Sequence, residues 1–289
     1  MTSIGLTLSS EEHSATDLIG YARRAEETGF DFVSISDHYH PWISDQGHAP
    51  FVWSTLGGIA AVTDEIDVGV GVTAPIIRMH PAVYAQAAAT AAAMFDGRML
   101  EEAVEVTRRL WTGEEVSHYG EHYTVENARL FTLPEEPPPI CVSAYGDRAA
   151  RAAAEFGDGF WCVGPQDAIE TWENHGGDGP RFCQLDACVA DSEDEAVRTA
   201  YENWPNTGLE GELSAELPTP AHFEQAVRMV SEEDIAAGST ITDPDPQAHI
   251  DGIEAAVDAG YDHVYTHQIG DDQEALIDLY REEVLPSFS

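Results

Sequence analysis

Residues 4–35, IGLTLSSEEHSATDLIGYARRAEETGFDFVSI, decide the fold. Short apolar runs at 4–8 and 32–35 predict two strands, and the stretch 16–28 between them repeats apolar residues at helical spacing. Gly29 stands where a residue in the left-handed conformation would end that helix. A strand, a helix and a strand in direct succession form the repeating unit of a parallel sheet wrapped by helices.

The same alternation continues along the chain. Helical patterns cover 51–62 and the Ala-rich run from Pro81 to Met94. At Asp96-Gly97-Arg98 the alternation breaks, because a second helical pattern at 99–111 follows with no strand between. Five further strands are predicted at 67–72, 140–143, 160–163, 182–190 and 263–267.

Seven strands, with the break where a fourth of eight is expected, predict an α/β fold: a TIM-type (β/α)8 barrel that lacks about one strand unit near strand four. Alternating residues at 115–133 predict a β-hairpin outside the main repeat. The stretch 203–242, interrupted by proline and glycine, predicts an insertion with two short helices before the last strand. We expect one barrel domain over 1–289, because a barrel of this length is an ordinary single domain.

The charge is strongly acidic. Asp and Glu number 53 against 13 basic residues, all of them Arg, for a formal charge of −40. Such a surface repels nucleic acid and anionic lipid, so neither is expected as a partner. It suits a salt-rich, halophile-type cytosol, where the Debye length falls to roughly 3 Å at about 1 M salt.

Nothing in the sequence predicts export or a membrane. The first ten residues lack a basic and apolar leader, and no apolar run approaches the length that spans a bilayer. The four cysteines lie in apolar runs without CxxC spacing, which favours reduced core residues: Cys141, Cys162, Cys183 and Cys188. We therefore expect a cytoplasmic protein.

The loop after the second strand concentrates groups capable of chemistry. Residues 36–42, SDHYHPW, hold a carboxylate, two imidazoles and an indole. His38 follows the strand end directly, where barrels carry their working residues, and its ring can exchange a proton near neutral pH. A capped turn with a partly buried histidine is the plain alternative. A zinc site at the pair His38 and His40 is a third, disfavoured because no His stands near the ends of the fifth and sixth strands.

Three stretches closely resemble the F420-dependent glucose-6-phosphate dehydrogenase-like family of the luciferase-like superfamily. They are 36–53 (SDHYHPWISDQGHAPFVW), 78–86 (RMHPAVYAQ) and 100–133, with WTGEEVSHYGEHYTVENARLFTL at 111–133. The resemblance implies coenzyme F420, a two-electron hydride carrier, bound in the barrel mouth. It implies that Asp37 contacts the deazaflavin, His38 acts as the general base, and Trp42 stabilises the reacting intermediate. Relatives of this kind are commonly homodimers and act on small molecules.

The resemblance also implies a cofactor site on two other loops. Gly71-Val72 matches the place where such enzymes hold a bulge with a non-prolyl cis peptide against the ring. The residues Ala144, Tyr145 and Gly146 lead into a helix, whose N-terminal amides can hold the coenzyme's phosphate.

The chain departs from the family in two places. Relatives carry a fourth strand between the residues that match Arg98 and Met99, followed by the Glu that donates a proton. A βαβ unit takes about 30 residues or more, so its absence is a structural change. Val163 and Gln166 stand where relatives place phosphate-binding side chains, so glucose 6-phosphate is a poor candidate substrate.

These observations favour an F420-dependent oxidoreductase acting on a small alcohol, carbonyl or activated alkene. Two alternatives stay open. One is a cofactor-binding relative that lost catalysis with the missing unit. The other is an FMN-dependent luciferase-like monooxygenase, which would consume oxygen because FMN, unlike a deazaflavin, activates it.

Overall fold

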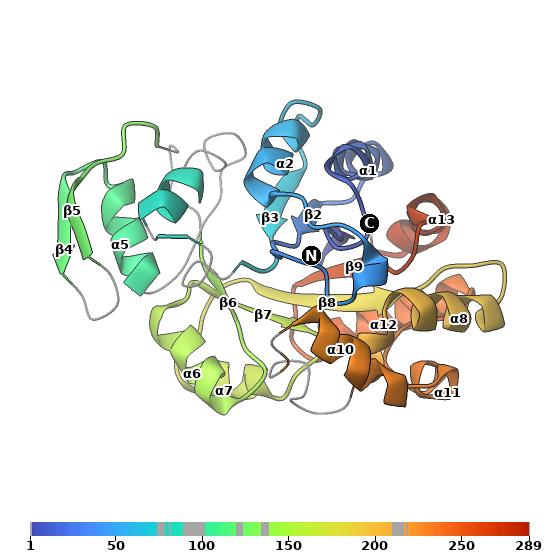
Figure 1. The fold of residues 1–289 in the computed structure, drawn as a ribbon. Coiled ribbons are helices and arrows are strands. Elements are labelled where there is room, and N and C mark those ends of the chain that lie inside the picture. The colour runs from blue at the N-terminus through green and yellow to red at the C-terminus, as the bar shows by residue number, and fades with distance from the viewer. Residues whose placement is uncertain are drawn as a thin grey trace.

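Seven parallel strands form one curved sheet in the order β3-β2-β1-β9-β8-β7-β6. The computed structural model describes residues 2–73, 79–80, 82–88, 102–119, 124–133, 139–209, 217 and 219–288. Helices lie around the outside of the sheet (Figure 1). The strands are β1 (Ser3–Leu8), β2 (Phe32–Ile35), β3 (Asp67–Val70), β6 (Cys141–Ser143), β7 (Gly159–Val163), β8 (Arg181–Ala187) and β9 (His263–Gln268).

Local sequence sets the ends of the first helix. The Ser14 hydroxyl accepts the amide of Asp17 where α1 (Ala15–Thr28) begins. Gly29, with φ of 99°, ends the helix as predicted, and its amide donates to the carbonyls of Ala25 and Glu26. The other helices of the barrel wall are α2 (Val52–Ile59), α6 (Asp147–Phe156), α7 (Ala168–Asn174), α8 (Glu193–Asn203), α12 (Pro246–Asp258) and α13 (Gln273–Leu279).

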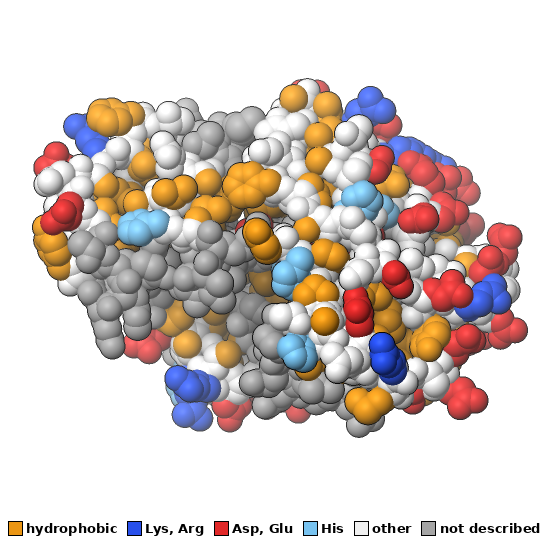
Figure 2. Space-filling model, in the orientation of Figure 1, with side chains coloured by type: hydrophobic (Ala, Val, Ile, Leu, Met, Phe, Trp, Pro, Cys, Tyr) orange, Lys and Arg blue, Asp and Glu red, His pale blue; other side chains and the backbone are white. Residues whose placement is uncertain are grey.

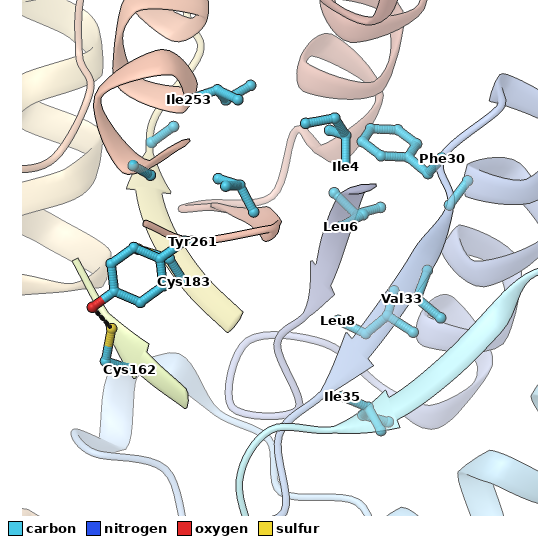
Figure 3. Close-up of a cluster of buried hydrophobic side chains, with 14 of the residues drawn as sticks. Ile4, Leu6, Leu8, Phe30, Val33, Ile35, Cys162, Cys183, Ile253 and Tyr261 are labelled. Atoms are coloured by element: carbon cyan, nitrogen blue, oxygen red, sulfur yellow. Dashed lines mark hydrogen bonds between the residues drawn. The ribbon is translucent and has the colours of Figure 1, made fainter. Parts of the chain in front are cut away.

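The sheet divides the core into two layers, because alternate side chains of a strand point to opposite faces. The outer layer lies between the sheet and the helices and includes Leu6, Val33 and Ile253; Figure 3 shows it, with Tyr261 hydrogen-bonded to Cys162. A smaller inner layer fills the barrel with Phe32, Trp161, Tyr265 and their neighbours.

The barrel is open where the fourth strand is missing. Among the described residues no strand pairs with the outer edge of β3 or of β6. The helical segment 82–88 and α5 (Glu102–Trp111) cover this seam from outside. Tyr84 and Trp111 pack with Ile140 and Val142 at β6, and Tyr84 meets Trp53 of α2 with ring centroids 5.4 Å apart. Side-chain packing therefore bridges the seam between the β3 and β6 sides.

The excursions lie where the sequence predicts them. The hairpin β4 (Val116–Tyr119) and β5 (Thr124–Ala128) lies beside α5, away from the barrel (Figure 1). The insertion contains the two short helices α10 (Pro220–Ala226) and α11 (Glu232–Ala236). β3 ends at Val70, two residues before the predicted end at 72, and β8 ends at Ala187 rather than at 190. All four cysteines are free, and Cys141 is only partly buried.

Candidate active site

The loop after β2 presents His38 beside Trp42. Nδ1 of His38 forms an ion pair with Oε1 of Glu11, and the His38 side chain is 29 % exposed. The two rings meet edge to face, with centroids 4.9 Å apart. The imidazole is therefore not packed into the core, and with Nδ1 engaged by Glu11, proton exchange with a substrate falls to Nε2.

Glu11 is a buried, ionised partner for that imidazole. Its residue surface is 1 % exposed, and Oε2 accepts the Ser36 hydroxyl at 2.7 Å. Burial raises the pKa of Glu11, but the charge and hydrogen bond of His38, together with the Ser36 bond, outweigh it and lower the pKa to about 2. A permanent carboxylate at Nδ1 keeps a proton there and fixes the tautomer of His38.

The turn 9–12 that carries Glu11 is tied to the end of β2. The amide of Ser10 donates to Oγ of Ser36 at 2.9 Å, and the Ser10 hydroxyl donates to the Ser36 carbonyl at 2.8 Å. Ser36 thus accepts from the turn and donates to Glu11, which fixes the carboxylate relative to the loop that holds His38.

Trp42 is held from the insertion side. Its ring meets Phe223 of α10 with centroids 5.0 Å apart, and it packs against a buried cluster that includes Trp204. Gln46 accepts the Trp42 amide at 2.9 Å and donates to the carbonyl of Asn203 at 3.1 Å. The insertion therefore builds an aromatic wall beside the imidazole.

Asp37 lies against a cis peptide bond between Gly71 and Val72, which confirms the predicted non-prolyl cis bond at this position. The Asp37 amide donates to the Val72 carbonyl at 3.3 Å, and the Thr73 hydroxyl donates to Asp37 Oδ2 at 2.6 Å. A Cβ at Gly71 would lie 2.4 Å from Oγ of Ser34, so the packing here requires glycine.

The loop after β6 leads into an uncapped helix. Gly146 is the N-cap of α6 and makes no side-chain cap bond, and an open hollow of about 490 Å³ lies over this helix start, lined by Gly146, Asp147 and Arg148 among others. Tyr145 is 55 % exposed. Ala144 is buried and its amide donates to the Trp161 carbonyl at 3.0 Å, so that amide is already satisfied.

His40 is exposed, with Nδ1 at 2.9 Å from the Pro41 carbonyl, and the described residues contain no group of three or more His, Cys, Asp or Glu arranged for a metal ion. The junction of Arg98 and Met99, where the family resemblance implies a missing strand and an acidic Glu, lies outside the described residues.

The model of the luciferase-like monooxygenase family matches residues 1–100 and 98–263. The chain belongs to this family. The two matched stretches meet at 98–100, the same place where the strand alternation of the sequence breaks.

Relatives within the luciferase-like family cover nearly the whole chain. The F420-dependent glucose-6-phosphate dehydrogenase of Nakamurella multipartita is 31 % identical, covering 98 % of this chain and 95 % of the relative. The F420-dependent hydroxymycolic acid dehydrogenase of Mycobacterium tuberculosis is 32 % identical over 98 % and 87 %. The structure of an F420-dependent secondary alcohol dehydrogenase with an F420-acetone adduct superposes with a TM-score of 0.88 at 26 % identity, covering 98 % of both chains.

Sequence reasoning missed three residues next to this luciferase-like site: Glu11, Glu12 and His267. Their positions in the sequence could have indicated them. Glu11 and Glu12 follow the first strand and His267 lies at the end of the last, and functional residues of barrels lie at these C-terminal strand ends. His267 contacts Glu12 at 2.9 Å across 255 residues of sequence, a pairing that only the strand order reveals.

Proposed function

We propose that the protein is an F420-dependent oxidoreductase that transfers a hydride between the deazaflavin and a small neutral alcohol or carbonyl, or an activated alkene. The single observation that carries the proposal is the buried Glu11 carboxylate on Nδ1 of a partly exposed His38. The dehydrogenase names of the relatives support the reaction class.

The residues around the mouth fit F420. Gly71 and Val72 follow β3 at the mouth, and Asp37 lies beside them with its amide bonded to the Val72 carbonyl. The amides of Tyr145, Gly146 and the first turn of α6 suit the coenzyme's phosphate, since a helix N-terminus without a side-chain cap attracts an anion. When bound, F420 supplies two-electron hydride chemistry.

His38 handles the proton in both directions. During oxidation, neutral Nε2 takes the proton of the substrate hydroxyl; during reduction, the imidazolium returns it to the carbonyl oxygen. Glu11 stabilises the imidazolium and holds the ring in place. The pair therefore supplies the base for oxidation and the acid for reduction at the substrate oxygen. The separate proton that relatives obtain from the Glu after their fourth strand comes from water in this proposal. Trp42 packs edge to face against the imidazole, and Phe223 packs against Trp42, so aromatic side chains cover one side of His38.

The site favours a neutral substrate over a sugar phosphate. Where relatives bind phosphate, Val163 has an apolar side chain and Gln166 turns to the backbone, with Nε2 donating to the Val163 carbonyl at 3.0 Å. Neither offers a positive charge to a phosphate monoester. The wall made by Trp42 and Phe223 suits an alkyl group.

Binding and turnover together test the function. Titration should show F420 binding with quenched fluorescence and weaker binding of FMN. Secondary alcohols should reduce F420, whereas glucose 6-phosphate should not. Binding without turnover on any alcohol, carbonyl or alkene would indicate the catalytically impaired alternative. Oxygen consumption with reduced FMN would indicate the monooxygenase.

Two matched variants locate the phosphate end of the cofactor. Arg148 lines the hollow at the start of α6, and Arg151 lies on the same helix outside that lining. Arg148→Glu should weaken F420 binding about 10-fold by placing an anion beside the phosphate, while Arg151→Glu should change it by less than about 2-fold. Equal losses in both variants would place the phosphate elsewhere.

Solvent and assembly form a separate proposal. We propose one domain that works as a homodimer, as the family resemblance implies. We also propose a salt-rich cytoplasm as its solvent, because dissolved salt screens the mutual repulsion of a chain with a formal charge of −40. None of the helices in the described ranges is long and apolar enough to cross a membrane. Light scattering and thermal unfolding along a KCl series test the proposal. A monomer at every salt concentration, or a melting temperature that falls as salt is added, would contradict it.

A further inference from the structure

A second charged cluster lies on the other side of the turn that carries Glu11. Nε2 of His267 lies 2.9 Å from Oε2 of Glu12, and Nδ1 lies 3.1 Å from Oδ1 of Asp186. The side chains of His267, Glu12 and Asp186 are 2 %, 4 % and 11 % exposed. Trp204 covers the His267 ring edge to face at 4.5 Å. The cluster joins the ends of β8 and β9 to the segment after β1.

His267 is a cation in this cluster. Each ring nitrogen faces a carboxylate oxygen, so both nitrogens must carry a hydrogen to donate. Burial lowers the pKa of His267, but the hydrogen bonds and charges of Asp186 and Glu12 outweigh it and raise the pKa to about 10. The cluster is therefore a fixed ion triad at neutral pH.

The turn is clamped from both sides by adjacent carboxylates that point in opposite directions. Glu11 faces β2, where it meets Ser36 and His38. Glu12 faces β9, where it also accepts the Gly270 amide at 3.0 Å. A shift of Glu12 therefore moves the backbone that places Glu11.

We propose that Glu12 and His267 are positioning residues, which hold the turn 9–12 so that Glu11 stays in contact with His38. Their effect on catalysis rests on the proposed function, whereas their effect on the His38 ring does not. The coupling passes through the backbone between two neighbouring residues and needs no contact between His267 and His38.

A purely electrostatic influence predicts the opposite sign for one variant. Removing the His267 cation would, by charge alone, favour the protonated form of His38 and raise its titration midpoint. Loss of the Glu11 contact would lower that midpoint, because a carboxylate at Nδ1 favours the imidazolium. The direction in which the His38 midpoint shifts in a His267 variant therefore distinguishes loss of the Glu11 contact from a direct effect of the His267 charge.

The neighbouring titratable groups His13 and Cys188 do not change charge in the pH range of the His38 titration above pH 7. His13 and Cys188 interact with Glu12, and burial is the first cause at each, lowering the pKa of His13 and raising that of Cys188 to about 12. Both are therefore neutral around pH 7. The charge near the turn is that of Glu11, Glu12, His267 and Asp186, together with Asp17 and Asp271 beside His13.

The experiment is histidine NMR on labelled protein without added cofactor, with the His38 resonance assigned from a His38→Gln sample. We expect His267→Gln, Glu12→Asp and Glu11→Gln each to lower the His38 midpoint by about 1 pH unit. Glu12→Asp keeps the charge and changes only the reach, so it decides the question if His267→Gln does not fold. His249→Gln is the control, since His249 is also fully buried, on α12 near Tyr280.

An unchanged midpoint in Glu12→Asp, or a raised midpoint in His267→Gln, would overturn the proposal. In turnover assays both variants should lower kcat about 10-fold at unchanged F420 affinity. If the wild-type protein fails to turn over any substrate, the proposed function fails, while the NMR result still decides the positioning role.

Discussion

Replacing His38 by Ala should lower kcat about 10² to 10⁴-fold, the usual contribution of a positioned acid–base group. The substrate hydroxyl would then lose its proton to water rather than to an imidazole that Glu11 holds in place. F420 affinity should change by less than about 3-fold, because the cofactor site proposed above lies at the backbone of Gly71-Val72 and the start of α6. Steady-state kinetics and fluorescence titration measure the two quantities separately.

His40→Ala is the matched control for this variant. His40 lies on the same loop, but it is exposed and directed to the Pro41 carbonyl. Its replacement should leave kcat within about 2-fold of the parent. Similar losses in both variants would mean that the loop as a whole, and not the His38 imidazole, matters. Full activity in His38→Ala would end the assignment of the base.

Local signals account for the parts of the fold and site that the sequence predicts. The start and end of α1 follow from Ser14 and Gly29, whose side chain and backbone freedom act within one helical turn. His38 is predictable because it directly follows a short apolar strand, and the end of a barrel strand is where functional groups gather. The cis bond at Gly71-Val72 was predicted through the family resemblance rather than from local chemistry.

Contacts between distant segments account for what the sequence does not predict. His267 meets Glu12 only because β9 pairs with β1, and Phe223 meets Trp42 only because the insertion folds back over the loop. The side-chain packing that bridges the seam between β3 and β6 also depends on contacts between distant segments. Tyr84 and Trp111 carry ordinary helical spacing, and nothing local indicates that they bridge β6 and α2. Such pairings depend on strand order and packing.

The second large effect concerns Glu11→Gln, which should lower kcat about 10²-fold and change how stability depends on pH. A neutral amide at Nδ1 neither stabilises the imidazolium nor fixes its tautomer. In the folded protein the pKa of Glu11 is lowered from 4.5 to about 2. Because the folded value is depressed, the stabilisation is present above pH 4.5 and is lost as pH falls through 2. The difference corresponds to about 3 kcal/mol.

Urea unfolding of the parent and of Glu11→Gln, at several pH values between about 2 and 7, measures the contribution of ionised Glu11 to the free energy of unfolding. The stability gap is the free energy of unfolding of the parent minus that of the variant, compared from one pH to the next. The stability gap should be largest near pH 7 and should narrow as the solution is acidified, because the parent loses the ionised Glu11 while the variant has none to lose. Glu26→Gln is the control for activity alone. Glu26 accepts three backbone amides on the surface, from residues 64–66. Burial raises its pKa, but these bonds outweigh burial and lower the pKa as well. Glu26→Gln should leave kcat unchanged. A gap for Glu11→Gln that stays constant with pH would mean that Glu11 is not the low-pKa partner of His38, and the proton-handling pair would have to be reassigned.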